Sequence, residues 1–548
     1  MKSKRIVFFL IYALLAHTSH SQNWHWVNQI GGSGTEGSAM MCMDSNGNIY
    51  MAGAFSSNPC LFTNDSLTPV GANDAFVAKY DQSGNEIWVK KFGGNNSSMQ
   101  IEEIGSIVYN GETNSIFISG LFFGVASFDT TLLSSSGNGD GFIARLDIDG
   151  NIKWAKKAGG FETDRSDAMD VDSNGRVFVE YNISQNGHID TNNVSPGVYI
   201  AIYDSSGICL TVTKKFNESG NGTEAFFTKL ICNGNYIFGF GIFFNDTLSA
   251  DTVTLISNFH GGQYMLGCMD KSNSLNLLWL KPISAKFRGI GDFVIDNDHN
   301  FYVSGAFADS AIFGLDTISI TSSIADLFFT KYDSLGNNIW HLHTNATNFA
   351  NGARIALDNE NGEYVTGMFM GNAIFENDTV TSVPDGNLFI ARFDSSGNLI
   401  GLRNTPGGSG TGITLNNTGD IFLCGNFRDT INFQITTLTS SGSWDDFIAK
   451  SDPLTGIERG EEERGSNTLV IYANPNQGTC NINIPTEFKH EHNLTISIYD
   501  NNAKLIQQGT VQMDSEKIRV NLEAEAKGIY NVTLSNGKKI YAGKIVFE

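Results

Sequence analysis

The stretch Asp74–Trp88 reads DAFVAKYDQSGNEIW and is the clearest copy of a unit that recurs along this 548-residue chain. It joins an alternating strand to a second strand containing Trp, through a turn at Gly84-Asn85. Alternating apolar and polar residues on both sides of such a turn predict an antiparallel hairpin. Related stretches end at Trp154 and Trp340. The fold therefore follows from a repeat.

The Asp that begins this turn marks the period of the repeat. Successive anchors are 57 to 66 residues apart, and they are Asp81, Asp147, Asp204, Asp270, Asp333, Asp394 and Asp452. Each period also contains a turn followed by a strand, such as DSNGNIYMAGAF at 44–55. We therefore expect about four strands in each period. Short antiparallel units cannot bury both faces alone, so they must stack on their neighbours.

The two ends of the repeat complement each other. A lone Trp strand at 23–27 is followed by Gly31-Gly32, as Trp88 is followed by Gly93-Gly94. The last anchor, Asp452, ends a strand with no Trp strand after it. We therefore predict that the N-terminal strand completes the last unit and closes a ring. The predicted fold is all-β, with a seven-bladed β-propeller over 22–456.

The units ending at Asp81, Asp147, Asp333 and Asp452 resemble the bacterial β-propeller repeats of the SBBP family. The shared pattern is G-x-D-x-F-[VI]-A-[KR]-x-D followed by G-N-x-x-W, and the resemblance is weak around 180–270. The Asp–Gly–Trp element also resembles the tryptophan-docking motif of quinoprotein dehydrogenases. Those enzymes use adjacent cysteines, which this chain lacks. That resemblance therefore implies no quinone cofactor.

The N-terminus has the pattern of a secretory signal peptide. Basic residues Lys2, Lys4 and Arg5 precede the apolar run 6–16, and small residues stand at Ser19 and Ser21. We expect a signal peptide over 1–21, cleaved between Ser21 and Gln22. The alternative is a membrane anchor, but the run is shorter than the ~20 residues that span a bilayer. No later stretch reaches that length, so no transmembrane segment is expected.

The repeat stops after Asp452. Residues 457–467 read IERGEEERGSN, a charged stretch flanked by Gly that predicts a solvated linker. Short alternating strands then fill 468–548, the size and pattern of a small β-sandwich.

This C-terminal segment resembles the type A sorting domain of type IX secretion cargo. Ala473 and Ala503 depart from the family pattern, and the matching positions are Tyr472, Asn474, Pro475, Gly528, Tyr530 and Lys544. The resemblance implies export across the outer membrane of a Bacteroidota-type bacterium, with the type IX machinery as partner. It also implies release or attachment at the cell surface. A β-sandwich binding module without a sorting role is the alternative.

Composition limits the classes of partner. The chain has 35 Lys+Arg and 57 Asp+Glu, giving a formal charge of −22. Such acidity argues against nucleic acid, whose phosphates would repel it. Seven cysteines are scattered without a CxxC pair, so no disulfide framework is expected, although one or two bridges stay open. We expect a monomer.

One stretch has the start of a calcium loop. Asp170, Asp172 and Asn174 follow the Asp-x-Asp-x-Asn-Gly pattern, but Tyr181 stands where an EF-hand places Glu. Equivalent runs at Asp44 and Asp296 favour a hairpin turn in which the side chain bonds the backbone. A weak surface calcium site is the alternative, and no other metal or cofactor is expected.

Repeated acids and histidines have two interpretations each. Asp74, Asp140, Asp326 and Asp445 either cap turns, which we favour, or form a carboxylate ring in the central channel. The pairs His341/His343 and His490/His492 lack a third zinc ligand and are expected to be packed or exposed. A ligand face, if present, is expected in the least regular region, 180–270, which carries Tyr181, His188, His260 and Tyr264.

No catalytic motif stands out. The run Gly407-Gly-Ser409-Gly-Thr411 lacks the last Gly of a nucleophile elbow. A secreted, non-catalytic binding, adhesion or scaffold protein with an extracellular glycan or protein ligand is therefore favoured. The alternative is an extracellular hydrolase or lyase acting on polysaccharide with its site on one propeller face. Propellers support both, so the fold does not decide between them.

Overall fold

The computed structural model describes residues 23–454 except 95–101, 130, 220–221, 224, 245–246, 251–252, 258–261, 273, 290, 321–323 and 377. Towards the C-terminus it describes 469, 471–472, 478–484, 488, 494–500, 504–511, 517–522, 524, 526–536 and 540–547. Internal contacts divide the chain into two units, Met1–Glu458 and Arg459–Glu548. The predicted signal peptide with its cleavage site at Ser21 and Gln22, the linker 457–467, Asn474, Pro475, His260, His490 and His492 lie outside the described residues.

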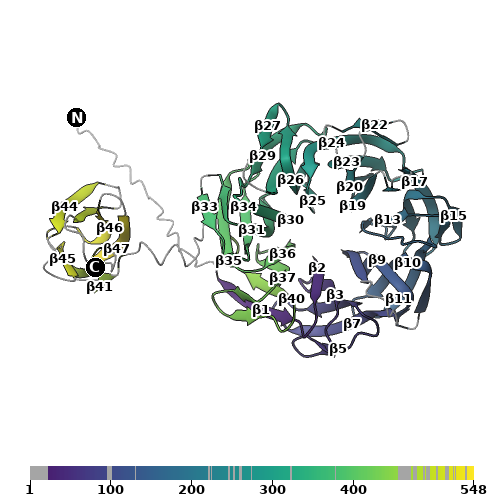
Figure 1. Cartoon of the computed structure of the whole chain (residues 1–548), viewed down its shortest axis with the longest axis horizontal. Coiled ribbons are helices and arrows are strands. Elements are labelled where there is room, and N and C mark those ends of the chain that lie inside the picture. Colours follow the sequence, from purple (N-terminus) through teal and green to yellow (C-terminus); the bar gives the residue numbers. More distant parts are fainter. Residues whose placement is uncertain are drawn as a thin grey trace, which may run out of the picture. The chain divides into compact units, whose positions relative to one another are not determined.

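In the first unit, four-stranded antiparallel sheets are arranged around a centre, which is the architecture of a β-propeller (Figure 1). Each sheet is named here by its inner strand. From inner to outer strand the described sheets are β2(Glu36–Met43)–β3(Ile49–Phe55)–β6(Asp74–Tyr80)–β7(Glu86–Gly94), β8(Glu103–Asn110)–β9(Ser115–Phe128)–β10(Thr131–Asp147)–β11(Ile152–Gly160), β12(Met169–Val171)–β13(Val177–Ile183)–β16(Gly197–Tyr203)–β17(Cys209–Ser219), β19(Ala225–Asn233)–β20(Tyr236–Phe243)–β23(Gln263–Asp270)–β24(Leu277–Phe287), β25(Asp292–Ile295)–β26(Phe301–Phe313)–β28(Asp326–Tyr332)–β29(Asn338–His343), β30(Phe349–Leu357)–β31(Glu363–Met370)–β34(Asn387–Phe393)–β35(Leu399–Pro406), and β36(Ser409–Leu415)–β37(Ile421–Phe427)–β40(Asp445–Ser451)–β1(Trp24–Ile30).

Short hairpins decorate these sheets. They connect or extend the second and third strands, and those described are β4(Cys60–Leu61)–β5(Ser66–Leu67), β14(Gly187–Ile189)–β15(Asn192–Val194), β21(Thr247–Ala250)–β22(Val253–Ile256), β32(Asn372–Phe375)–β33(Asp378–Thr381) and β38(Thr430–Asn432)–β39(Thr437–Thr439). Strand β27(Asp316–Ser319) pairs with β26, and β18(Gly222–Thr223) pairs with β17.

The first strand of the chain closes the last sheet. Strand β1 pairs antiparallel with β40, with Trp26 opposite Lys450 and Ile30 opposite Asp446. The predicted pairing of the N-terminal Trp strand with the strand before Asp452 is therefore confirmed. A ring closed in this way leaves no terminal sheet that needs a cap.

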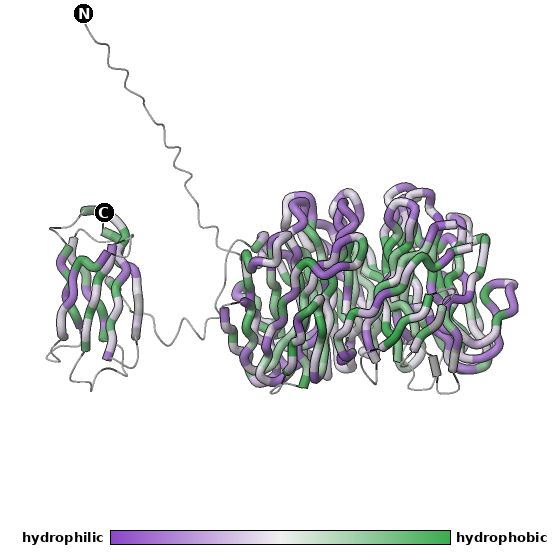
Figure 2. Tube along the Cα trace, turned by 90° about the horizontal axis from the view of Figure 1, so that it is seen from above, coloured by the Kyte–Doolittle hydropathy of each residue, from purple (hydrophilic) through white to green (hydrophobic). Residues whose placement is uncertain are grey.

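The hydrophobic core lies between neighbouring sheets. One cluster joins Ile30, Met51 and Phe76 to Cys424 and Ile448, so it spans the boundary between the β2 and β36 sheets. The third strands, such as β6, are buried along their whole length because both faces are covered. Figure 2 shows hydrophilic residues gathered on the loops, with hydrophobic residues along the strands. The burial of both faces explains the nearly continuous apolar runs in the third strands.

The repeated Asp-x-x-Gly-Asn run forms a hairpin turn, as predicted. Asp81 Oδ1 accepts hydrogen bonds from the backbone N–H groups of Ser83 (2.8 Å) and Asn85 (2.9 Å). Gly84 adopts a φ of +83°, which strongly favours glycine. The same pair of backbone bonds recurs at Asp147, Asp204, Asp333 and Asp394. The turn at Asp270 is longer, and its carboxylate accepts from the N–H groups of Ser272 and Asn276, two and six residues later.

Four of these turns, at Asp81, Asp147, Asp204 and Asp394, receive a tryptophan from the preceding sheet. Trp154 Nε1 donates to the backbone oxygen of Ser205 (3.0 Å), and its ring lies over Gly207. Equivalent bonds run from Trp26 to Gln82, from Trp88 to Ile148 and from Trp340 to Ser395. The repeated spacing of Asp, Gly and Trp therefore ties each of the four sheets that carry these tryptophans to the next one.

The second unit contains two antiparallel sheets among its described residues. One has the order β41(Ile471–Tyr472)–β42(Thr479–Asn483)–β45(Lys517–Asn521), and the other β44(Leu505–Val511)–β43(Leu494–Tyr499)–β46(Gly528–Ser535)–β47(Ile540–Phe547). Side chains from both sheets share one hydrophobic cluster. Of the predicted sorting residues, Tyr472 lies in β41, Gly528 and Tyr530 in β46, and Lys544 in β47 opposite Asn531.

Candidate functional site

A cavity of about 250 Å³ occupies the centre of the ring, lined by the inner strands of all the sheets described above. Its charged side chains have protein partners. Lys229 Nζ lies 2.6 Å from Asp292 Oδ1, and Asp292 Oδ2 accepts from the Ile355 N–H (3.0 Å). Arg354 Nε donates to the Thr411 oxygen (3.1 Å). These bonds cross between neighbouring sheets, so they hold the ring together.

The three residues of the calcium-loop pattern have different partners. Asp170 lines the cavity, and its Oδ2 accepts from the Cys232 N–H at 2.6 Å. Asp172 Oδ1 accepts from the backbone N–H groups of Asn174 and Arg176, and its Oδ2 pairs with the Arg176 guanidinium. The favoured hairpin turn is therefore present. Calcium binding there stays a prediction, and the described residues contain no group of three His, Cys, Asp or Glu side chains arranged for a metal.

The repeated acids before the third strands cap turns, as favoured. Asp74 Oδ2 accepts from the Val70 N–H (2.9 Å) and Asp140 Oδ2 from the Ser136 N–H (3.0 Å). Asp326 accepts from the Asn345 and Ala346 N–H groups. These acids do not line the central cavity.

Two expectations for ligand-facing residues were wrong. Tyr181 and Tyr264 are fully buried, because the irregular region 180–270 still forms strands whose aromatic side chains point into the core. His188 is exposed on β14. His341 stacks on Phe313 and His343 hydrogen-bonds Asp326 Oδ2 (2.8 Å), so this pair is packed as expected.

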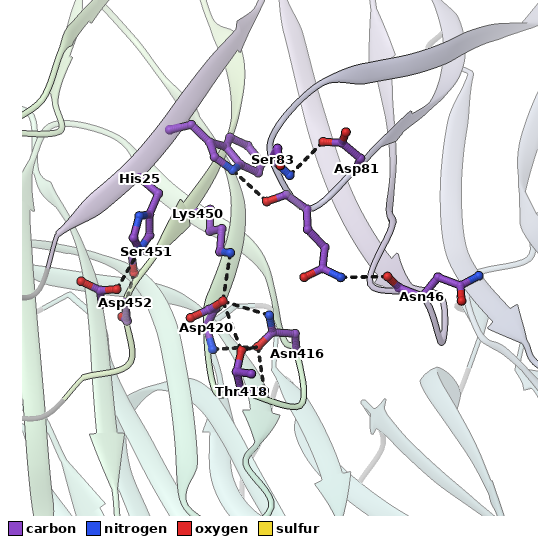
Figure 3. Close-up of polar contacts among 12 residues, drawn as sticks. His25, Asn46, Asp81, Ser83, Asn416, Thr418, Asp420, Lys450, Ser451 and Asp452 are labelled. Carbon is purple, nitrogen blue, oxygen red and sulfur yellow. Dashed lines mark hydrogen bonds and ion pairs between the residues drawn. The ribbon is translucent and has the colours of Figure 1, made fainter.

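A larger groove, about 530 Å³, opens where the turns of the β36 and β2 sheets meet. Its walls come from four separate segments of sequence. They are Met43, Asp44, Ser45, Asn46, Gly47, Gln82, Tyr109, Thr414, Leu415, Asn416, Asn417 and Thr418. Figure 3 shows Asn46 on one ribbon and Asn416 and Thr418 on the neighbouring one.

Most residues lining this groove carry an amide or a hydroxyl group, and Asp44 is the only charged residue among the described residues of the lining. The Asp44 carboxylate is already occupied by the Asn46 and Asn48 N–H groups and by the hydroxyl of Tyr50. Gln82 Nε2 donates to the Asn46 backbone oxygen (2.8 Å) and fixes that turn. The exposed Asn46 and Asn417 side chains have no hydrogen-bond partner among the described residues, so they can bind a ligand.

Aromatic and turn contacts make the groove walls rigid. Tyr109 stacks on Tyr50 with ring centroids 6.5 Å apart, and its hydroxyl bonds Asn114 Oδ1 (3.1 Å). Asn416 Oδ1 accepts from the Thr418 and Asp420 N–H groups. Nearby, Lys450 pairs with Asp420 (2.9 Å), so this charge is balanced too. Sequence reasoning missed the groove because each wall alone looks like an ordinary hairpin turn.

Comparison with known proteins identifies the C-terminal region. Residues 470–548 match the secretion system C-terminal sorting domain. The chain is therefore a type IX secretion cargo, exported to the cell surface or beyond. No helix in the described parts of the chain is long and apolar enough to cross a membrane.

The chain is also distantly similar to a curated protein. The chain is 24% identical over 140 residues to the regulatory protein FlaEY of Caulobacter vibrioides, a match that covers 25% of this chain and 14% of that protein. The chain thus matches about a seventh of this relative's length.

Similar solved structures have low identity and low TM-scores. The Dos1 propeller is 10% identical, with a TM-score of 0.38 over 80% of this chain and 97% of that one. A member of the duf4221 family from Bacteroides vulgatus is 9% identical, with a TM-score of 0.32 over 79% and 98%. The GH43 endo-arabinanase from Bacillus licheniformis is 11% identical, with a TM-score of 0.22 over 47% and 87%.

Proposed function

We propose that this type IX cargo is a non-catalytic binding protein whose propeller holds a neutral, hydroxyl-rich ligand, a glycan, in the groove between the β36 and β2 sheets. The observation that carries this proposal is a 530 Å³ groove lined by amides and hydroxyls whose single carboxylate is already occupied. Amide and hydroxyl groups both donate and accept, which suits the hydroxyl groups of sugars.

The charge of the groove favours a neutral ligand. The whole chain has a formal charge of −22, yet this lining presents amides and hydroxyls instead of free acids. A cationic ligand would gain little there, and an anionic one would meet no positive side chain in the lining.

The proposed organisation is a signal peptide over 1–21, a seven-bladed propeller with SBBP-type repeats over 22–456, a linker over 457–467 and a β-sandwich sorting domain over 468–548. The β1–β40 pairing supports closure of the ring by the first strand. The shared core of the two C-terminal sheets supports the sandwich. Attachment of the cargo at the surface would present the propeller to extracellular glycan.

A polysaccharide hydrolase or lyase is the second candidate, and one observation favours it. Burial raises the pKa of Asp170, which lines the central cavity, to about 6. A carboxyl group with such a pKa suits general acid catalysis near neutral pH.

The test is a glycan-binding screen of the full chain with product analysis. Asn46→Ala and Asn417→Ala should each weaken binding, by roughly tenfold if one hydrogen bond worth about 1.4 kcal/mol is lost. Asn174→Ala is the matched control, because Asn174 occupies the position of Asn46 in the equivalent turn of the β12 sheet. Equal affinity in all variants would remove the groove from the proposal. New reducing or unsaturated ends would favour the enzyme.

A further inference from the structure

One position of the repeat brings a residue from six of the sheets to the central cavity. It lies on the first strand of each sheet, opposite a fixed position of the second strand, as Arg354 lies opposite Thr366. The equivalent residues that line the cavity are Met40, Ser106, Lys229, Asp292, Arg354 and Gly412. Two of these six are cations and one is an acid, so their charges do not cancel.

The acid, Asp292, pairs with Lys229 and not with Arg354. Lys229 Nζ lies 2.6 Å from Asp292 Oδ1, and the Phe293 N–H donates to the same oxygen (2.9 Å). Asp292 Oδ2 accepts from the Ile355 N–H at 3.0 Å. Both carboxylate oxygens of Asp292 are therefore engaged by other donors.

Arg354 forms no ion pair among the described residues. Its Nε donates to the backbone oxygen of Thr411 (3.1 Å), which holds the guanidinium against the β36 sheet. That sheet contributes Gly412 at the equivalent position, so it supplies no side chain to pair with Arg354. The two terminal nitrogens of Arg354 have no hydrogen-bond acceptor among the described residues, so they can donate to a ligand in the cavity.

The far side of the cavity offers apolar contacts. Strands β8 and β12 belong to the third sheet from the β30 sheet in either direction around the ring, and Figure 1 shows the neighbouring strands β9 and β13 across the centre from β30. They contribute Ile107 and Met169 to the lining. Met40 and Met41 of β2 add flexible thioether side chains, which adapt to an irregular apolar ligand. The cavity therefore combines one unpaired cation with apolar surface.

We propose that the central cavity binds a small organic monocarboxylate, whose carboxylate pairs with the terminal nitrogens of Arg354 and whose apolar part contacts the methionine and isoleucine side chains. A guanidinium presents parallel N–H donors that match a carboxylate in bidentate geometry. The volume of about 250 Å³ lies just below the ~300–1,000 Å³ typical of sites for drug-sized ligands, so the acid is small.

This site is independent of the proposed glycan groove. The two share no residue among the described parts of their linings. The groove presents no cation, whereas the cavity presents Arg354. The carboxylate proposal therefore goes beyond the proposed function and does not rest on it.

Asp170 opposes the binding of an anion. Besides Asp292 it is the one acid in the described lining, and it forms no ion pair among the described residues. Its Oδ2 accepts from the Cys232 N–H at 2.6 Å, a bond that the amide oxygen of asparagine can also accept. Asp170→Asn should therefore strengthen carboxylate binding without loss of this contact.

The test compares benzoate with its neutral amide, benzamide, by isothermal titration calorimetry on the full chain at pH 7.5. We expect benzoate to bind at one site and benzamide to bind roughly tenfold more weakly or less well than that. The formal charge of −22 repels anions from the protein as a whole, so a preference for benzoate requires a local positive group. Inorganic phosphate should bind more weakly than benzoate, because it has no apolar part.

Substitutions of Arg354 test its assigned role. Arg354→Gln should weaken benzoate binding by roughly tenfold to a hundredfold, the value of a hydrogen bond to a charged group, and should leave benzamide binding nearly unchanged. Arg354→Lys keeps the charge but not the bidentate geometry, so it should retain part of the affinity. Arg428→Gln is the matched control, because it removes an exposed guanidinium that does not line the cavity, and it should bind benzoate like the unchanged chain.

Circular dichroism should show that each variant is folded, and Asp170→Asn keeps the proposal testable if the Arg354 variants do not fold. Equal affinities for benzoate and benzamide would overturn the proposal, as would unchanged benzoate affinity in a folded Arg354→Gln. Phosphate binding tighter than benzoate binding would overturn the assignment to an organic acid, and so would the absence of saturable benzoate binding. Asn417→Ala changes only the groove and should leave benzoate binding intact, so the two proposals fail separately.

Discussion

Replacing Trp154 tests how strongly a docked indole joins two sheets. Trp154→Phe removes the hydrogen bond to the Ser205 oxygen but keeps an aromatic ring between Phe117 and Tyr203, whose centroids lie 6.1 and 6.2 Å away. The Ser205 oxygen retains Arg145 as a donor, so no buried acceptor is left unpaired. The cost is therefore the net value of one hydrogen bond, about 1 kcal/mol, plus the smaller buried area of the ring.

Trp279→Phe is the matched comparison. Trp279 occupies the same repeat position, but among the described residues its Nε1 makes no hydrogen bond, so this change removes only ring area. Trp154→Phe should lower the free energy of unfolding by about 1 kcal/mol more than Trp279→Phe does. Trp154→Ala should cost about 3 kcal/mol, the low end for large aromatic residues, because this ring is half-buried.

Urea unfolding followed by far-UV circular dichroism measures these differences without depending on tryptophan fluorescence. Equal losses in the two Phe variants would refute the role given to the indole N–H. A loss in Trp154→Ala below about 1 kcal/mol would refute ring packing against the Ser205 turn as a source of stability.

Three other predictions follow from buried carboxyls, glycines and the sorting domain. Burial, followed by the nearby Asp74 carboxylate, raises the pKa of Glu102 to about 8, so the folded chain holds this proton more tightly than the unfolded chain does. The resulting stability is full below about pH 4.5 and falls by up to about 1.4 kcal/mol per pH unit until about pH 8. Urea titrations at several pH values should show a smaller slope for Glu102→Gln. Gly159→Ala should destabilise the fold by at least about 2 kcal/mol, because its Cβ would meet Asp140 Oδ1 at 2.5 Å. Gly111→Ala, whose Cβ would have no atom nearer than 3.8 Å, should cost less than about 1 kcal/mol. Equal Tm values for the two variants would contradict this packing. Deleting 468–548 should abolish export while the propeller still folds, which cell fractionation and circular dichroism of the retained protein would show; normal export of the deletion would contradict it.

Local chemistry made much of the ring predictable. Asp81 accepts hydrogen bonds from the backbone N–H groups of the residues two and four positions later, so five consecutive residues specify its turn. The lone Trp strand at the start and the unpaired strand at the end likewise predicted the β1–β40 pairing.

Features assembled from distant segments could not be predicted. The groove needs Asn46, Tyr109 and Asn417, which belong to three different sheets. Tyr181 and Tyr264 interrupt the repeat pattern, and this irregularity suggested that their side chains are exposed. Both side chains are instead buried, because the strands that carry them direct them towards the core. Asp446 follows Asp445 directly, and only the alternation of β40 shows that its carboxyl group faces the neighbouring sheet without a partner.

The β1–β40 pairing also means that β1 is synthesised long before its partner strand. Strand β1 ends at Ile30, but its partner ends at Ser451, so 421 residues must be added before the two can meet. At about 5–20 residues per second, β1 waits roughly 20–80 s. During that interval its Trp-bearing edge is open to chaperones or to other nascent chains. A circular permutant that places β1 directly after β40 would replace this wait with the formation of a local hairpin.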